Sequence, residues 1–116
     1  MIVDKPWGKV TTYALNQPSS VRIITIDPGQ ETSEHFHHLR DEMWVVLDDG
    51  LRIQVGQQTV EAQPGDEFVV AAEQLHRIAN AGTRRGRVLE IAHGYTSEDD
   101  TFRLQDDYGR PLEPRR

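Results

Sequence analysis

The sequence predicts an all-β protein whose short strands form a single barrel or sandwich. No segment longer than about ten residues repeats its apolar positions at the helical period. β-branched and aromatic residues instead gather in short runs, and Gly, Pro, Asn and Asp residues separate these runs at close spacing. A chain of 116 residues can build one core but not two, so we expect one domain over residues 1–116.

The elements can be placed in order along the chain. The segment 1–9 contains a Pro-Trp-Gly turn signal and predicts an N-terminal arm rather than a helix. The run 51–55 alternates strictly between apolar and polar residues, which is the pattern of a half-buried strand. From about residue 105 to residue 116 the sequence predicts an irregular tail. Strands are expected at 10–15, 21–27, 35–38, 43–47, 51–55, 59–62, 67–72, 76–80, 88–93 and 102–104.

Composition excludes several classes of function. The chain has no cysteine, which excludes disulfides, iron–sulfur clusters and cysteine nucleophiles. It has no apolar run long enough to cross a membrane, and its N-terminus lacks the pattern of a secretory signal, so we expect a cytoplasmic protein with no membrane partner. The net charge is −6 and the basic residues form no long stripe, which argues against a nucleic-acid partner.

Three histidines and a carboxylate have the spacing of a metal site. His35 and His37 are two residues apart, and on a strand such residues point to the same face. Glu42 follows after the chain has turned, and we expect His76 to join these three from further along the chain. His38 points the other way and is excluded from the ligands. This set predicts one divalent transition-metal ion (Zn, Mn, Co, Ni or Fe) with positions open for water or substrate.

Two spaced motifs around these residues resemble those of the cupin superfamily. The first runs from Gly29 to Gly50 with the ligand spacing His-x-His-x4-Glu, and the second runs from Gly65 to Asn80 around His76. The resemblance implies a double-stranded β-helix, the jelly-roll barrel of cupins. It also implies that the ligand positions of both motifs hold one metal ion.

The flanking residues resemble a narrower family, the type II mannose-6-phosphate isomerase cupin. The resemblance spans roughly residues 4–110 and implies the interconversion of mannose 6-phosphate and fructose 6-phosphate. In that family the unit often forms the C-terminal part of a bifunctional mannose-1-phosphate guanylyltransferase, and here we expect it to stand alone. The matching segments include KPWG at 5–8, RDEMW at 40–44, HR at 76–77, SEDD at 97–100 and DYGR at 107–110.

The resemblance also implies a phosphate site and a base. Arg110, in the matching Tyr-Gly-Arg segment, or Arg22, on a strand that leads into the site, would bind the phosphate of a sugar-phosphate substrate. Glu31, Glu34 and His93 are all candidates for the base, and their spacing does not separate them.

Three positions depart from the family pattern. The family usually has Gln at the position of His35, Lys at the position of Arg22, and Gln near positions 92–93. Two alternative functions therefore stay open: a mononuclear Fe(II) dioxygenase and a non-catalytic sugar-binding cupin. Because cupins of this kind commonly pair through exposed strands, we also expect a homodimer, in which the arm at residues 1–9 could exchange between copies.

Overall fold

The computed structural model describes residues 1–113, and over this range the regular structure is β-sheet apart from a single turn of 3-10 helix. The predicted all-β class is therefore confirmed. None of the helical structure in these residues is long and apolar enough to cross a membrane. The elements are β1 (Ile2–Lys5), β2 (Gly8–Thr11), β3 (Ser20–Ile26), β4 (Glu34–Phe36), β5 (Arg40–Val46), β6 (Leu51–Val55), β7 (Gln58–Glu61), β8 (Glu67–Val70), β9 (His76–Asn80), β10 (Gly86–Gly94), η1 (Glu98–Asp100) and β11 (Phe102–Gln105).

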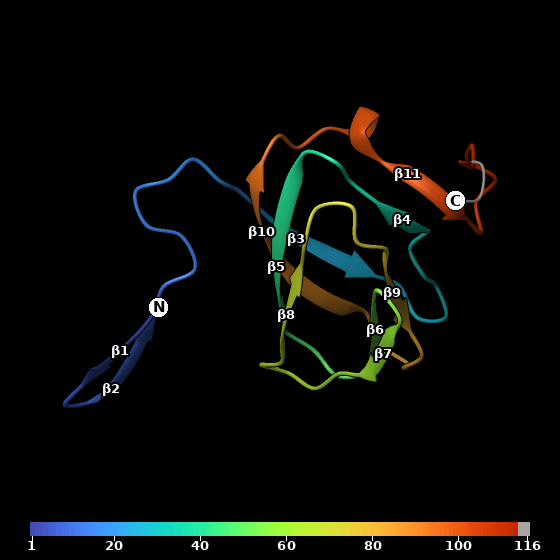
Figure 1. Ribbon diagram of the computed structural model, residues 1–116. Helices are drawn as coiled ribbons and strands as arrows, with labels where there is room; N and C mark the ends of the chain where they lie inside the picture. Colours follow the sequence, from blue (N-terminus) through green and yellow to red (C-terminus); the bar gives the residue numbers. More distant parts are fainter. Residues whose placement is uncertain (114–116) are drawn as a thin grey trace.

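Two sheets enclose the core of the barrel (Figure 1). One sheet has the strand order β3-β10-β5-β8, and the other has the order β11-β4-β9-β6-β7. The alternation predicted for residues 51–55 is observed, because Leu51 and Ile53 are buried in the core while Arg52 is exposed. Burying an apolar side chain of this size stabilises the fold by about 1.5–3 kcal/mol.

The N-terminal arm is a β-hairpin that lies outside the barrel (Figure 1). β1 and β2 pair with each other in a sheet of their own, with Val3 opposite Val10. The strand predicted at 10–15 is therefore wrong, because the chain pairs backward across the Pro6-Trp7 turn and leaves the ladder after Thr11. The tail expected at 105–116 is irregular over residues 106–113, and its last three residues lie outside the described part of the chain.

Two local features of the fold position the candidate site. β4 lies beside β9, so that His35 and His76 are register partners although 41 positions separate them in the sequence. β5 begins at Arg40, three residues earlier than predicted, so that Glu42 lies inside the strand rather than just before it. Glu42 and Trp44 consequently share the inward face of β5, where both are buried.

Candidate metal centre

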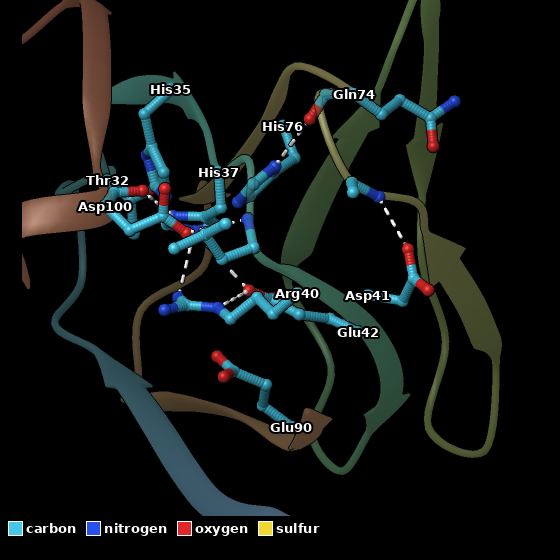
Figure 2. A network of polar contacts seen from close by, with 12 residues as sticks. Thr32, His35, His37, Arg40, Asp41, Glu42, Gln74, His76, Glu90 and Asp100 are labelled. Atoms are coloured by element: carbon cyan, nitrogen blue, oxygen red, sulfur yellow. Dashed lines mark hydrogen bonds and ion pairs between the residues drawn. The ribbon is translucent and has the colours of Figure 1, made fainter. Parts of the chain in front are cut away.

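Three histidine side chains converge on one point of the barrel interior. The ligand atoms of His35, His37 and His76 all lie within 4.8 Å of one another. Figure 2 shows that His35 and His37 come from β4 and the residues just after it, whereas His76 comes from β9. His37 and His76 are buried and His35 is half-buried. The predicted same-face relation of the first two histidines is what brings their rings together, with centroids 4.9 Å apart.

Each imidazole is held by a backbone carbonyl at its Nδ1 atom. The Nδ1 of His35 lies 2.8 Å from the carbonyl oxygen of Ser33, that of His37 lies 2.8 Å from the carbonyl of Asp100, and that of His76 lies 2.9 Å from the carbonyl of Gln74. A carbonyl only accepts hydrogen bonds, so each Nδ1 carries the proton and donates it. Each Nε2 is then an unprotonated nitrogen, the form in which imidazole binds a metal ion.

The same three imidazoles are neutral at physiological pH. Burial lowers the pKa of His35 to about 2 and that of His76 to about 4, and the mutual repulsion of the histidines adds to the effect. Burial also lowers the pKa of His37. Three neutral, pre-oriented imidazoles fit a divalent transition-metal ion, because such an ion does not have to displace protons from its ligands.

Glu42 lies beside this cluster but is not part of the group of three. Its Oε1 accepts a hydrogen bond from Trp44 Nε1 at 2.8 Å, and its Oε2 accepts one from Arg40 Nε at 2.7 Å. The same Oε2 lies 3.4 Å from His37 Nε2, which Arg40 also contacts at 2.9 Å (Figure 2). Burial raises the pKa of Glu42, but the neighbouring His76 and the bonds from Arg40 and Trp44 outweigh it and lower the pKa. The role of Glu42 as a fourth ligand stays a prediction. Because Arg40 contacts both Glu42 Oε2 and His37 Nε2, metal binding by either atom requires the Arg40 side chain to move.

His38 has surroundings of its own. Its Nδ1 lies 3.0 Å from the Glu73 carboxylate, and its ring is 41% exposed. The ring also packs against Phe102 and Phe36 on the side of β4 away from the three histidines. His38 is therefore not a member of the cluster.

A cavity of about 690 Å³ opens above the cluster. Its wall carries the three histidines, Glu42 and Trp44, and it adds charged side chains from several elements. The arginines and the remaining acidic residues in the wall are Arg22, Arg40, Arg103, Arg110, Asp27, Glu31, Glu90 and Glu98. A cavity of this size and polarity suits a small polar ligand.

The two arginines predicted to bind phosphate both reach the cavity, and both are paired with carboxylates. Arg22 donates to both oxygens of Glu90 at 2.8 and 3.1 Å. Arg110 is bound to Asp106 at 2.7 Å and holds the pKa of that carboxyl at about 2. An anionic ligand would therefore have to compete with these carboxylates.

Sequence reasoning missed Arg103, which also lines the cavity. Its position on β11 is the register partner of His35 on β4, so the cluster and this guanidinium share one edge of the sheet. Its only ion pair among the described residues is a 3.3 Å contact with exposed Glu98, and its buried Nε has no hydrogen-bond partner there. The sequence predicts the strand at 102–104 that carries Arg103. It does not show that this strand pairs with β4, which is what brings Arg103 to the cavity.

The three candidate bases differ in whether they line the cavity. Glu31 lines the cavity and lies 3.4 Å from Arg77. Glu34 instead accepts a hydrogen bond from Gln54, and neither it nor His93 is among the lining residues. Glu90, which the spacing did not single out as a base, is 2% exposed and lines the cavity. Burial and the charge of Glu42 raise its pKa, and the bond from Arg22 offsets them only in part.

The fold and the histidine cluster together define the class of protein: a cupin, a double-stranded β-helix barrel built around a candidate metal site. The structure is similar to a double-stranded β-helix protein from Klebsiella pneumoniae, with a TM-score of 0.61 and 20% identity over 71% of this chain and 72% of that one. It is also similar to a protein provisionally named a sugar phosphate isomerase, from Acidithiobacillus ferrooxidans. That match has a TM-score of 0.58 and 29% identity over 64% of this chain and 49% of that one.

The sequence comparison gives the particular family. Residues 1–106 match the family described as "Mannose-6-phosphate isomerase C-terminal", and the chain belongs to it. The chain is 32% identical to the alginate biosynthesis protein AlgA of Pseudomonas aeruginosa over 97% of its own length and 24% of that protein. It is 33% identical to the mannose-1-phosphate guanylyltransferase RfbM of Salmonella typhimurium over 89% of its length and 22% of that protein. The chain thus spans about a quarter of the length of these relatives.

Proposed function

We propose that this domain is a metal-dependent sugar-phosphate isomerase that interconverts mannose 6-phosphate and fructose 6-phosphate. The observation that carries the proposal is the cluster of three neutral histidines, which line a cavity together with arginines and carboxylates. Membership of the mannose-6-phosphate isomerase C-terminal family supports the choice of substrate. The names of the relatives, which concern mannose phosphates and polysaccharide synthesis, agree with it.

The proposed metal site consists of His35, His37 and His76, with Glu42 as a further ligand. A divalent ion bound there would polarise the C1 and C2 oxygens of the sugar and make the hydrogen on the neighbouring carbon more acidic. The carbonyls of Ser33, Asp100 and Gln74 keep the three rings in the orientation that this role requires.

Arg103 is the first candidate for the substrate phosphate. Its Nε has no hydrogen-bond partner among the described residues, and its partner Glu98 is exposed, so a phosphate would gain a guanidinium without breaking a buried ion pair. Arg22 and Arg110 remain candidates for further phosphate contacts. Each of them is already bound to a carboxylate, so a phosphate would have to replace that carboxylate to bind there.

Glu90 is the proposed base. Its carboxylate is buried in the cavity wall, and Arg22 fixes its orientation with two hydrogen bonds. It would remove the proton from C2 of the aldose and return the same proton to C1, while a proton passes from the C2 hydroxyl to the C1 oxygen. The overall reaction then moves two hydrogens and needs no other reactant. A pKa raised by burial brings a carboxyl group closer to the range in which it transfers protons efficiently.

The proposal is tested by a coupled assay that follows the conversion of mannose 6-phosphate to fructose 6-phosphate. The protein is stripped of metal and reloaded separately with Mn²⁺, Zn²⁺, Co²⁺, Ni²⁺ or Fe²⁺. We expect turnover that depends on the metal, disappears in His76→Ala and falls by at least about 100-fold in Glu90→Gln. In Arg103→Gln we expect KM to rise by roughly tenfold or more. Arg52→Gln, which alters an exposed arginine on the outside of the barrel, is the matched control and should keep both constants.

Stoichiometric metal binding without turnover for any of these ions would overturn the isomerase. The arrangement of three histidines would then favour the second candidate, because such a set with open positions also suits Fe(II) and oxygen chemistry. Oxygen uptake by the Fe²⁺-loaded protein would distinguish this dioxygenase from a non-catalytic sugar-binding cupin.

A further inference from the structure

The guanidinium of Arg40 lies between two of the atoms that would bind the metal ion. Its Nε donates to Glu42 Oε2 at 2.7 Å, and its Nη2 donates to His37 Nε2 at 2.9 Å (Figure 2). The side chain is only 5% exposed, and among residues 1–113 its guanidinium makes no other hydrogen bond. A buried cation therefore already occupies part of the candidate metal centre.

The two atoms that Arg40 contacts are both acceptors, and they lie 3.4 Å apart. The Nδ1 of His37 donates its proton to the carbonyl of Asp100, so the Nε2 atom has a lone pair and no hydrogen. Buried acceptors such as these are stabilised only when a donor or a cation lies beside them. Two ligands about 2.1 Å from one ion at a tetrahedral angle are about 3.4 Å apart, so the same two atoms also suit a metal ion.

The two acceptors can stay in place when the guanidinium moves away. Trp44 Nε1 holds the other carboxylate oxygen of Glu42 at 2.8 Å. The backbone of Arg40 is fixed as well, because it pairs with Gly94 in the ladder between β5 and β10. The two strands approach so closely there that a Cβ on Gly94 would lie 3.0 Å from the Arg40 Cα. Arg40 lines the cavity, so its side chain can turn into that space while the strand keeps its position.

We propose that Arg40 is an internal competitor of the metal ion and thereby sets how tightly the centre binds metal. The guanidinium and the ion are both cations that require Glu42 Oε2 and His37 Nε2, so each excludes the other. The measured affinity is then the intrinsic affinity of the ligands multiplied by the fraction of chains in which Arg40 has turned away. This role presupposes the metal centre of the proposed function, but not its isomerase activity.

A purely structural role of Arg40 predicts the opposite result. If the guanidinium served only to orient Glu42, its removal would weaken metal binding, because the carboxylate would lose one of the two hydrogen bonds that hold it. If the guanidinium competes with the ion, its removal strengthens metal binding, because the ion then supplies the positive charge that the buried carboxylate requires. The sign of the change in affinity therefore distinguishes the two roles.

The proposal is tested by calorimetric titration of Mn²⁺, and separately of Ni²⁺, into the whole metal-free chain. We expect Arg40→Gln to bind each ion at least about tenfold more tightly than the wild-type chain, because the neutral amide does not compete as a cation. Arg40→Lys keeps a cation at this position and should stay closer to the wild type than to Arg40→Gln. Arg52→Gln, which changes an exposed arginine paired with Glu61, is the matched control and should bind like the wild type.

Binding by Arg40→Gln that is equal to or weaker than that of the wild type overturns the proposal and leaves the metal centre in place. Tighter binding of one ion alone also overturns it, because an internal competitor lowers the affinity for every ion by the same factor. Failure of both chains to bind either ion overturns the metal centre, and this role with it.

Two further variants secure the interpretation. Adding His76→Ala to Arg40→Gln should abolish the tighter binding, and binding that survives lies outside the histidine cluster and overturns the proposal. Circular dichroism shows whether each variant folds, and Arg40→Met, which keeps an apolar stem without the charge, replaces Arg40→Gln if that variant does not fold. Turnover is not measured, so the isomerase can fail while the competition stands.

Discussion

At the scale of single residues, the candidate site depends on the hydrogen bonds behind the histidines. A strand carries His35 and His37 on one face, but a ring on a strand can still rotate about its own bonds. The carbonyls of Ser33 and Asp100 remove this freedom by holding the Nδ1 atom of each ring. The rings are consequently oriented before any ion arrives, which would lower the entropy cost of binding a metal.

Alanine substitutions of single histidines should show which of them bind the metal ion and which do not. We expect His37→Ala or His76→Ala to lower the amount of bound metal sharply, because each removes one of three converging nitrogens. His38→Ala is the matched control and should barely change the metal content, since its side chain is paired with Glu73. Metal content is measured by elemental analysis after dialysis, and equal loss in all three variants would contradict the assignment of faces.

The lowered histidine pKa values predict how stability depends on pH in the metal-free protein. An unfolded chain protonates His35 and His76 below about pH 6.5, whereas the folded chain keeps them neutral down to about 2 and about 4. The unfolded state therefore binds more protons in this window, and the free energy of unfolding falls as the pH falls from about 6.5 towards 4. Each histidine contributes a slope of up to about 1.4 kcal/mol per pH unit.

Urea denaturation between pH 4 and pH 7 in the presence of a chelator measures this slope. His76→Gln should reduce it by the share of one histidine, because glutamine does not titrate. A slope that stays the same in His76→Gln as in the wild-type protein would show that His76 is not buried in its neutral form.

At the scale of elements, the turn η1 and strand β11 support the candidate site at the β11 edge of the five-stranded sheet. The carboxylate of Asp100, in η1, accepts hydrogen bonds from the backbone N–H groups of His38 and Leu39 at 3.1 and 2.9 Å. Its carbonyl holds His37, and β11 then pairs with β4. The segment after β10 thus fixes the loop between β4 and β5.

Removing the Asp100 carboxylate should loosen this loop. We expect Asp100→Ala to lower the free energy of unfolding by about 1–3 kcal/mol, because it leaves two backbone N–H groups without their acceptor. We also expect weaker metal binding, since His37 belongs to the loop. Asp99→Ala changes the exposed neighbour in the same turn and should have little effect on either quantity. Chemical denaturation and metal titration of both variants check the prediction, and equal effects would refute it.

At the scale of the whole molecule, one barrel wall separates two kinds of surface. The inner face of the sheet β3-β10-β5-β8 contributes Arg22, Glu42 and Glu90 to the cavity, while its outer face is apolar. The opposite sheet contributes the β4 and β9 histidines. A bound metal ion would therefore connect β4 and β9. These neighbouring strands share a single register pair, so the ion would reinforce the shortest strand pairing in that sheet.

Metal should accordingly raise the stability of the whole barrel. An ion that binds only the folded chain adds about 2.7 kcal/mol at a free concentration of 100 times its Kd. We expect the Tm to rise with the concentration of a binding ion and to stay constant in His76→Ala. Thermal unfolding monitored by circular dichroism measures this change. A Tm that responds equally in the variant would place the bound metal somewhere other than the histidine cluster.

Much of the fold and of the candidate site could be predicted because the relevant signals are local. The two-residue spacing of His35 and His37, the alternation at 51–55 and the turn residues between strands each report on neighbouring residues. The predictions failed where pairing partners decide the outcome. The arm became a hairpin because residues 8–11 pair with β1, and β5 began at Arg40 because it pairs with β10 up to Gly94.

The sequence by itself determined the all-β class, the two motifs and the histidines that would bind a metal, since side-chain direction on a strand follows from spacing alone. Only the tertiary structure decided that Glu42 is held by Arg40 and Trp44 and that the hairpin stands apart from the barrel. It also decided that Arg103 lines the cavity with an Nε that has no hydrogen-bond partner within residues 1–113. These features depend on the register between distant strands. The register is set by the packing of the whole barrel and cannot be inferred from any short stretch of the chain.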